Sequence, residues 1–542
     1  MDRTKDVTDL FKKHTKTFFD ENVKIPRLDQ KTYLVGGELR EWTGEVTKVF
    51  SPICYEDGSR IEIGSYPNQT AQDALAALAA AETAYNKGQG VWPSVTLAKR
   101  IDCMQNFVQL MKDQKRKVVR LLIWEICKNE ADAEKEFDRT VEYIEKTIEA
   151  AKEIDHNASK LMTEEGIIAQ VRRSPLGIVL CMGPYNYPLN EIYTTLIPAL
   201  LMGNVIIFKP AKYGILLHAP LFEAFQQAFP AGVVNSIYGD GRIIIGPLMA
   251  SGKIDVLAFI GTSKVANMLK HQHPYPNRLK CVLGLDAKNP GVVMANADID
   301  LAVKECLLGA LSFNGQRCTA LKILFVHKSI LGQFTAKITE AVEKLYIGVP
   351  GVGLSEDAKI TPLAEDNKVD FLTGMLKDAV DKNGHIINPS GGLSNGTFFF
   401  PAVVCPVTPE MRLYREEQFG PIVPIVPFED PSEIIQYVLD SNFGQQISIF
   451  GTDSWGIAQL IDPLSNQVSR ININCQCQRG PDSFPFTGRK DSAEGTLSIT
   501  DALKVFSIRA MVAAKATDQN KAIITRILTN RQSQFLSRDF IL

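Results

Sequence analysis

The sequence predicts an α/β protein, because short apolar runs rich in β-branched residues alternate with helical patterns along much of the chain. Most of these runs are followed within a few residues by Gly, Pro, Ser or Thr. The strand candidates between about residues 175 and 300 are 176–181, 205–208, 233–238, 256–260 and 280–285. This alternation is typical of a parallel sheet covered by helices, with ligands at the carboxyl ends of the strands.

A second βα pattern runs from Asn289 to about Asp430, with helices expected near residues 301–311 and 331–345. It predicts a second domain, and Cys318 lies in it. The segment 521–542 shows a further helical apolar pattern, which could pack on the body or on a partner.

Composition narrows the function classes. The chain has 542 residues, 45% of them hydrophobic and 22% charged, and a formal net charge of −2, which argues against a nucleic-acid partner. The N-terminus has no apolar core like that of a signal peptide, and no apolar run is long enough for a membrane span. Ten cysteines without zinc or disulfide spacing favour a reducing, cytoplasmic setting. Cys475 and Cys477 are interpreted as alternating residues on one face of a strand, and no metal site is expected.

The residues 313–320, Phe-Asn-Gly-Gln-Arg-Cys-Thr-Ala, place Cys318 beside the guanidinium of Arg317 after an apolar helical pattern. A thiolate is the nucleophilic form of cysteine, and a fixed cation or backbone N–H groups near the sulfur would lower the thiol pKa. On this stretch alone, a buried and inert cysteine is the favoured interpretation, because buried cysteines are common.

Six segments occur in the order and spacing of the sequence blocks of the aldehyde dehydrogenase superfamily, which the chain resembles over about residues 30 to 512. They are Gly183-Pro184-Tyr185-Asn186-Tyr187-Pro188, Phe208-Lys209-Pro210-Ala211, Phe259-Ile260-Gly261-Thr262-Ser263, Lys288-Asn289-Pro290, Gly315-Gln316-Arg317-Cys318 and Glu417-Gln418-Phe419-Gly420-Pro421. The resemblance implies a Rossmann-type cofactor domain, an α/β catalytic domain and a small β arm for oligomerisation. The expected division is an extension at 1–30, a cofactor domain at 31–287 with an arm segment near 160–176, a catalytic domain at 288–490, a return at 491–514 and a tail at 515–542.

The resemblance also implies a mechanism. Cys318 would attack an aldehyde to give a thiohemiacetal, hydride would pass to a nicotinamide cofactor, and the remaining thioester would be hydrolysed. Asn186 matches the family residue whose amide, with the backbone N–H of Cys318, stabilises the oxyanion.

Cofactor residues are carried over in the same way. Lys209 matches the lysine that reaches the adenosine ribose, and Gly261 and Thr262 match the turn beside the pyrophosphate. Glu417 matches the carboxylate that holds the nicotinamide ribose. Two further cofactor residues are expected, Phe419 in the same block and Gly241 in a loose glycine turn.

Lys212 stands three residues after Lys209, where family members that use NAD often have a glutamate. An ammonium group there attracts a 2′-phosphate, whereas a carboxylate repels it. We therefore expect NADP as the cofactor, with NAD still possible.

The segment 478–486, Gln-Arg-Gly-Pro-Asp-Ser-Phe-Pro-Phe, closely resembles that of the non-phosphorylating glyceraldehyde-3-phosphate dehydrogenases in this superfamily. Their phosphate and hydroxyl contacts fall on Arg139, Tyr187, Arg317 and Arg479. Arginine suits this task because its planar fork binds phosphate with two hydrogen bonds. The expected substrate is glyceraldehyde 3-phosphate, oxidised to 3-phosphoglycerate as a step linked to glycolysis.

The chain departs from the family at Gly284, where the general base is normally a glutamate. A glycine cannot take a proton, so Asp286, on the same side of an extended segment, is the first candidate for the base, and Glu417 is another. Two alternatives stay open. One is another aldehyde dehydrogenase that uses the same cysteine, acting on a semialdehyde or passing the acyl group to coenzyme A. The other is an inactive nucleotide-binding oligomer. The family resemblance implies a homodimer or homotetramer, with the segment 167–173 as the arm.

Overall fold

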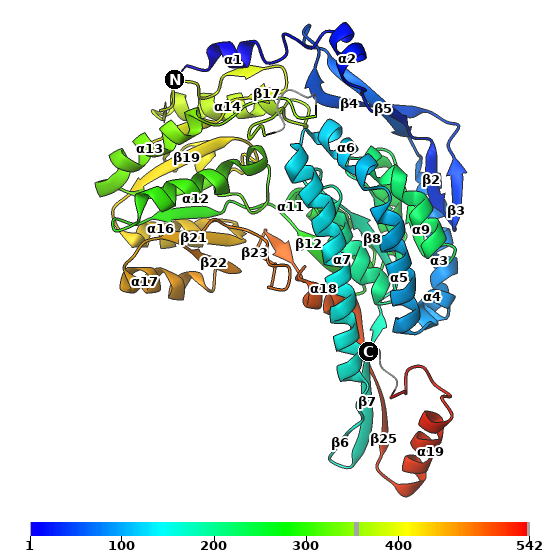
Figure 1. Ribbon diagram of the computed structural model, residues 1–542. Helices are drawn as coiled ribbons and strands as arrows, with labels where there is room; N and C mark the ends of the chain where they lie inside the picture. Colours follow the sequence, from blue (N-terminus) through cyan, green and yellow to red (C-terminus); the bar gives the residue numbers. More distant parts are fainter. Residues whose placement is uncertain (1, 352–356, 539–542) are drawn as a thin grey trace.

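A computed structural model describes residues 2–351 and 357–538. Figure 1 shows two sheet-containing halves side by side and a long arm that projects from one of them. The long helix α7 (Glu130–Ala158) runs between the halves and down into the base of the arm. In this part of the chain, no helix is both long and apolar enough to cross a membrane.

The first half contains a six-stranded sheet with the order β10-β9-β8-β11-β12-β24. Its parallel strands confirm the five predicted runs: β8 (Ile178–Met182), β9 (Val205–Lys209), β10 (Val234–Ser236), β11 (Val256–Ile260) and β12 (Lys280–Gly284). The short β24 (Ala493–Glu494) pairs with β12 in antiparallel direction, so the chain returns to this sheet near its end.

Helices cover this sheet and carry the turns at its carboxyl edge. They are α3 (Ala71–Tyr85), α5 (Leu97–Lys112), α6 (Lys115–Ile126), α8 (Asn190–Leu201), α9 (Phe222–Ala228), α10 (Gly241–Ala250), α11 (Ser263–Gln272) and α18 (Ile499–Val505). The side chains of Asp240 and Thr262 cap α10 and α11. Because α10 follows β10 and α11 follows β11, their N-terminal N–H groups lie at the carboxyl edge of this sheet, where ligands of α/β proteins commonly bind.

The second half contains a seven-stranded sheet with the order β15-β18-β19-β14-β13-β21-β22. Its strands are β13 (Pro290–Val293), β14 (Ile323–His327), β15 (His385–Ile386), β18 (Ala402–Cys405), β19 (Ile422–Phe428), β21 (Gln446–Phe450) and β22 (Arg470–Ile473). Its helices are α12 (Ile299–Leu311), α13 (Leu331–Glu343), α14 (Lys368–Asp381), α15 (Arg412–Arg415), α16 (Pro431–Asp440) and α17 (Ser454–Leu464). The two predicted helices are confirmed as α12 and α13.

Cys475 and Cys477 lie beyond the end of β22, at Ile473, so their interpretation as alternating strand residues was wrong. The reason is local: Asn474 has a φ of 52°, a left-handed conformation that ends the strand. Both Cys475 and Cys477 are free thiols.

The turn between α12 and Cys318 is tight. Phe313, Asn314 and Gly315 have φ values of 49°, 56° and 69°, so the backbone is left-handed at three successive residues. A Cβ on Gly315 would lie 2.7 Å from the carbonyl oxygens of Ala310 and Gly420, so a side chain there would clash with backbone. This turn places Cys318 between the end of α12 and the start of β14, where Asn289 Nδ2, just before β13, donates to its carbonyl.

The arm is a three-stranded antiparallel sheet of β6 (Met162–Glu164), β7 (Ile167–Pro175) and β25 (Ser507–Lys515). The predicted arm segment 167–173 lies within β7. The chain then forms α19 (Asp518–Thr529) beside the arm and turns back, where Gln170 Nε2 and Arg172 Nη2 donate to the carbonyl of Ser537. The tail therefore packs on this chain's own arm, and its predicted end at 539–542 lies outside the described residues.

The N-terminal extension packs on the second half of the molecule. It contains α1 (Thr4–Thr8) and α2 (Lys16–Asn22), and Arg3 donates to the carbonyls of Glu343 and Leu345. Two small β elements follow, the hairpin of β2 (Thr32–Val35) with β3 (Glu38–Glu41) and the sheet of β1 (Leu28–Asp29), β4 (Val46–Cys54) and β5 (Arg60–Pro67). The domain limits themselves stay a prediction, although β12 and β13, on either side of residue 287, belong to different sheets.

Candidate active site

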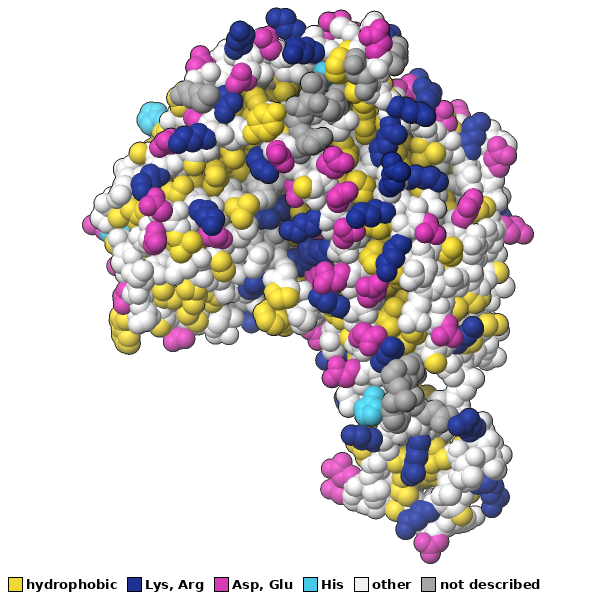
Figure 2. Space-filling view, in the orientation of Figure 1, with side chains coloured by type: hydrophobic (Ala, Val, Ile, Leu, Met, Phe, Trp, Pro, Cys, Tyr) yellow, Lys and Arg dark blue, Asp and Glu magenta, His cyan; other side chains and the backbone are white. Residues whose placement is uncertain are grey.

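A cleft of about 1510 Å³ collects most of the predicted site residues. Figure 2 shows Lys and Arg side chains gathered in the hollow in the middle of this face. The predicted residues that line the cleft are Arg139, Asn186, Tyr187, Gly261, Thr262, Asp286, Arg317, Cys318, Glu417, Phe419 and Arg479. Gly284 lines it as well. Segments far apart in the sequence therefore meet at one site.

Cys318 is half-buried, and burial raises the pKa of its thiol. The Glu191 carboxylate raises the thiol pKa further, while Lys322 and Arg479 lower it. The expectation that the Arg317 guanidinium lowers the thiol pKa was wrong. Arg317 Nη2 instead donates to the carbonyl of Gly309, at 3.3 Å, and to Gln476 Oε1, at 3.1 Å. Burial therefore favours the neutral thiol of Cys318 over the thiolate.

Asn186 is buried, and its Nδ2 donates to the carbonyl of Gln316, 2.8 Å away, two residues before Cys318. This bond fixes the amide beside the cysteine loop and leaves the second N–H of the amide for a ligand. The structure thus brings together the nucleophile and the predicted oxyanion donor.

A buried ion pair supports the turn that carries Asn186, and sequence reasoning missed it. Lys128 Nζ lies 2.5 Å from Glu136 Oε2, donates to the Asn186 carbonyl at 3.0 Å, and lies 3.6 Å from the centroid of the Tyr187 ring. Glu136 Oε1 accepts from the backbone N–H groups of Leu189 and Asn190. Both charges are therefore satisfied by the turn itself.

Glu417 is fixed from two sides. Its Oε1 lies 2.8 Å from Lys322 Nζ and accepts from the backbone N–H of Ala287 at 3.2 Å. Lys322 also donates to the carbonyl of Cys318 at 2.7 Å, so one buried ammonium links the carboxylate to the nucleophile's backbone. Next to it, burial lowers the pKa of Lys288 to about 7. Phe419 stands across the cleft edge, with its ring 5.9 Å from that of Tyr185.

Gly284 ends β12, and a Cβ there would meet Ile260 only at 3.4 Å, an ordinary contact. The space beside Gly284 would therefore accept a Cβ without a clash. Asp286 Oδ2 accepts from the backbone N–H of Ser263 at 2.7 Å, in the first turn of α11. This is the contact of a helix cap, and it holds the carboxylate at the cleft wall beside Gly261 and Thr262.

Lys209, Lys212 and Gly241 lie away from the cleft lining, at the ends of β9 and β10. Burial lowers the pKa of Lys209 to about 8, and a Cβ on Gly241 would lie 3.8 Å from Lys209 Cε, so the two are neighbours. Lys212 is 61% exposed and lies 2.7 Å from Asp366 Oδ2, so the expected partner of a 2′-phosphate is held by a carboxylate.

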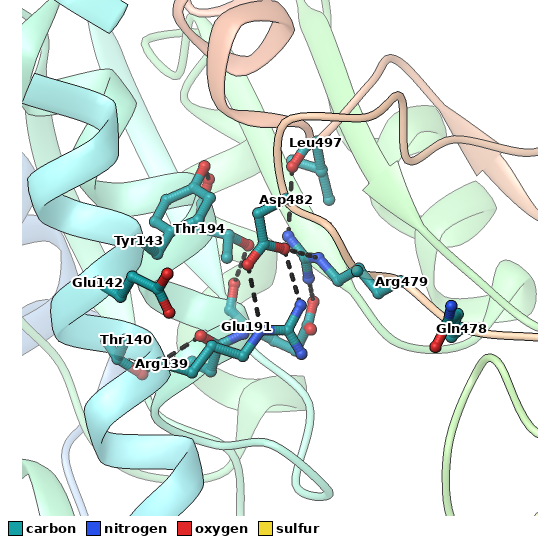
Figure 3. Close-up of polar contacts among 12 residues, drawn as sticks. Arg139, Thr140, Glu142, Tyr143, Glu191, Thr194, Gln478, Arg479, Asp482 and Leu497 are labelled. Carbon is teal, nitrogen blue, oxygen red and sulfur yellow. Dashed lines mark hydrogen bonds and ion pairs between the residues drawn. The ribbon is translucent and has the colours of Figure 1, made fainter. Parts of the chain in front are cut away.

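Two of the arginines expected to bind phosphate, Arg139 and Arg479, lie together but are paired with carboxylates (Figure 3). Arg139 binds Asp482 through Nε, at 3.1 Å, and Nη2, at 2.7 Å. Arg479 Nη1 donates to Glu191 Oε2, and Arg479 Nε lies 3.4 Å from Asp482 Oδ1. Sequence reasoning missed Glu191; the available signal was a lone carboxylate at the start of an otherwise uncharged helical run, 190–201.

Residues 43–512 match the aldehyde dehydrogenase family, which is most of the chain. The chain belongs to the aldehyde dehydrogenase family. This agrees with the fold, in which Cys318 lies just before the start of β14 in one sheet and the turn at Gly261 and Thr262 belongs to the other sheet, on the same cleft.

Individual relatives in this family differ in their named substrates. The chain is 31% identical over 495 residues to the NADP-dependent glyceraldehyde-3-phosphate dehydrogenase of Streptococcus equinus, covering 90% of this chain and 98% of that protein. It is 26% identical over 496 residues to the alpha-ketoglutaric semialdehyde dehydrogenase of Bacillus subtilis, covering 88% and 97%. Among solved structures, the NADP-dependent glyceraldehyde-3-phosphate dehydrogenase of Bacillus halodurans in complex with NADP has a TM-score of 0.83 and 30% identity, covering 91% of this chain and 100% of that one.

Proposed function

We propose that this aldehyde dehydrogenase oxidises glyceraldehyde 3-phosphate to 3-phosphoglycerate with NADP and water, without inorganic phosphate. The observation that carries the proposal is the shared cleft, in which Cys318 and the arginines at 139, 317 and 479 line one cavity. The names of the relatives from S. equinus and B. halodurans support the choice of substrate and cofactor.

In the proposed reaction, Cys318 Sγ forms a bond to the aldehyde carbon and the thiol proton passes to water. The carbonyl oxygen becomes an oxyanion that the free N–H of Asn186 and the backbone N–H of Cys318 stabilise. Bound NADP would supply the hydride acceptor, and loss of hydride from the aldehyde carbon would leave a thioester on Cys318. Water then attacks the thioester, releasing the acid and restoring the Cys318 thiol.

The residues that would hold NADP fit the group. Lys209 places an ammonium beside the start of α10, whose N-terminal N–H groups favour an anion, and Lys212 adds a second ammonium nearby. Gly261 and Thr262 would contact the pyrophosphate, and Glu417 with Phe419 would hold the nicotinamide end. A 2′-phosphate would take Lys212 from Asp366.

Asp286 is the group that we propose to activate water in place of the missing glutamate. One of its oxygens is anchored by Ser263, and the other makes no hydrogen bond to any residue within 2–351 or 357–538. A carboxylate fixed through one oxygen and free at the other has the form of a general base.

Gly284 also supports a second candidate function, transfer of the acyl group to coenzyme A. A thiol is a better nucleophile than water and needs no carboxylate base at this position. The two functions are separated by leaving coenzyme A out of the assay.

We also propose that the chain forms a homo-oligomer through the arm of β6, β7 and β25. The edge strand β25 exposes Ile508 by 55%, Met511 by 63% and Val512 by 41%, a concentration of apolar surface on a projecting strand. A cytoplasmic location stays a prediction from the cysteine content.

The phosphate end of the proposal is tested by Arg139→Leu, assayed with glyceraldehyde 3-phosphate and with uncharged glyceraldehyde. Arg139 is preferred to Arg479 for this test because the Asp482 carboxylate still has Arg479 as a partner when Arg139 is replaced. We expect the Michaelis constant to rise at least about tenfold for the phosphorylated substrate alone. Equal changes for both substrates would remove this arginine from the phosphate site.

A further inference from the structure

Glu191 places a carboxylate inside the substrate cleft. It stands in the first turn of α8, its side chain is only 9% exposed, and it lines the cleft with Cys318. Its Oε2 accepts a hydrogen bond from Arg479 Nη1, as Figure 3 shows. Its charge also reaches the nucleophile, because Glu191 raises the pKa of the Cys318 thiol.

Arg479 does not depend on Glu191 for its position. Its Nη2 donates to the carbonyl of Leu497 at 3.2 Å, its Nε lies 3.4 Å from Asp482 Oδ1, and its guanidinium lies 4.8 Å from the centre of the Phe486 ring. Asp482, Phe486 and Leu497 are not among the residues that line the cleft, whereas Glu191 is. Glu191 is thus the partner that arrives from the cleft side.

The charges in this cluster balance. The two guanidiniums of Arg139 and Arg479 face the two carboxylates of Glu191 and Asp482, and all four residues lie within one connected network. An anionic group that approaches Arg479 must therefore meet a carboxylate already in place. In a buried site, a like charge a few ångströms away opposes binding strongly.

The geometry points to Glu191 as a specificity-determining residue: it is an internal anion that competes with the anionic group of the substrate for Arg479. This inference rests on the proposed function, since it concerns an aldehyde that carries a phosphate. Glu191 would set the affinity for that group low enough for product to leave, and would exclude weaker anions.

The test replaces the charge and keeps the shape, with Glu191→Gln compared against Glu142→Gln. Glu142 lies on α7 one turn from Arg139, is 60% exposed, and pairs with Lys146 at 2.6 Å and not with the arginines. The two variants remove the same charge from the same region. Thermal unfolding of each protein checks its fold, and Glu191→Met is the second variant if Gln does not give folded protein.

Two readouts are measured on the purified full-length proteins. One is the Michaelis constant for glyceraldehyde 3-phosphate and for uncharged glyceraldehyde. The other is the concentration of inorganic phosphate that protects Cys318 from iodoacetamide, followed by mass spectrometry of the Cys318 peptide; this readout needs no turnover.

For Glu191→Gln we expect the phosphorylated substrate's Michaelis constant and the protecting phosphate concentration each to fall about tenfold, with glyceraldehyde changed less than about twofold. Glu142→Gln should change none of them by more than about twofold. Phosphate protection that is unchanged, absent in both proteins or weaker in Glu191→Gln would overturn the inference. If neither protein oxidises glyceraldehyde 3-phosphate, the proposed function fails, and the phosphate protection still decides the role of Glu191.

Discussion

Lys128 Nζ lies 2.5 Å from Glu136 Oε2, and neither side chain is exposed to solvent. The pair is tied to the catalytic turn, because Lys128 also donates to the carbonyl of Asn186. The position of Asn186, the proposed oxyanion donor, therefore depends on an ion pair between a residue just after α6 and one in α7.

Replacing Lys128 with Met should destabilise the protein by about 3 kcal/mol or more, because it leaves the Glu136 carboxylate buried without its cation. Urea unfolding followed by fluorescence measures the loss. The double variant Lys128→Met with Glu136→Gln should recover part of this stability, since it removes the unpaired charge. A loss in the double variant equal to the sum of the two single losses would show that the pair contributes no coupling.

The pKa of the Cys318 thiol can be followed by alkylation. Because burial and Glu191 raise this pKa, the rate of iodoacetamide labelling at Cys318 should still be rising above the pH at which an ordinary thiol has ionised. Lys322→Met should move the midpoint to higher pH, since Lys322 lowers the thiol pKa. Glu191→Gln should move it to lower pH. A midpoint below that of a free thiol in the unliganded enzyme would contradict this arrangement of charges.

The five strands of the first sheet were predictable because each is a continuous apolar run between turn residues, and β11 begins and ends where the pattern places it. These strands depend on residues that are close together in the sequence. The arm strand β7, in contrast, was expected from the family resemblance, and it contains the whole of the segment 167–173.

The partners within the site could not be predicted in this way. Arg479 and Glu191 are 288 positions apart, and Lys128 and Asn186 are 58 apart, so no local pattern joins them. The guanidinium of Arg317 is next to the nucleophile in sequence, yet it points to Gly309 and Gln476. Neighbouring positions in a chain do not fix where long side chains meet.

Cofactor choice is tested at Lys212. Lys212→Glu should raise the Michaelis constant for NADP at least about tenfold and leave that for NAD nearly unchanged, because the new carboxylate repels only the 2′-phosphate. Initial rates with each cofactor measure both constants. Lys48→Glu is a suitable control, since this exposed lysine pairs with Glu62 on the neighbouring strand β5 and not with Asp366. A parallel rise for both cofactors would mean that Lys212 acts on the fold and not on the phosphate.

Asp286 is tested by separating acylation from hydrolysis. For Asp286→Asn we expect a burst of NADPH equal to the enzyme concentration, followed by turnover slower by about a hundredfold, since the carboxamide cannot accept the proton from water. Stopped-flow absorbance at 340 nm would record both phases. Full steady-state turnover in this variant would remove Asp286 from the role of base.

The most direct measurement is NADPH formation by the purified protein with glyceraldehyde 3-phosphate and NADP, in buffer that lacks both phosphate and coenzyme A. The proposed function predicts sustained turnover over many enzyme equivalents, because water completes each cycle by hydrolysing the Cys318 thioester. A single burst that resumes only when coenzyme A is added, or no NADPH at all, would contradict it.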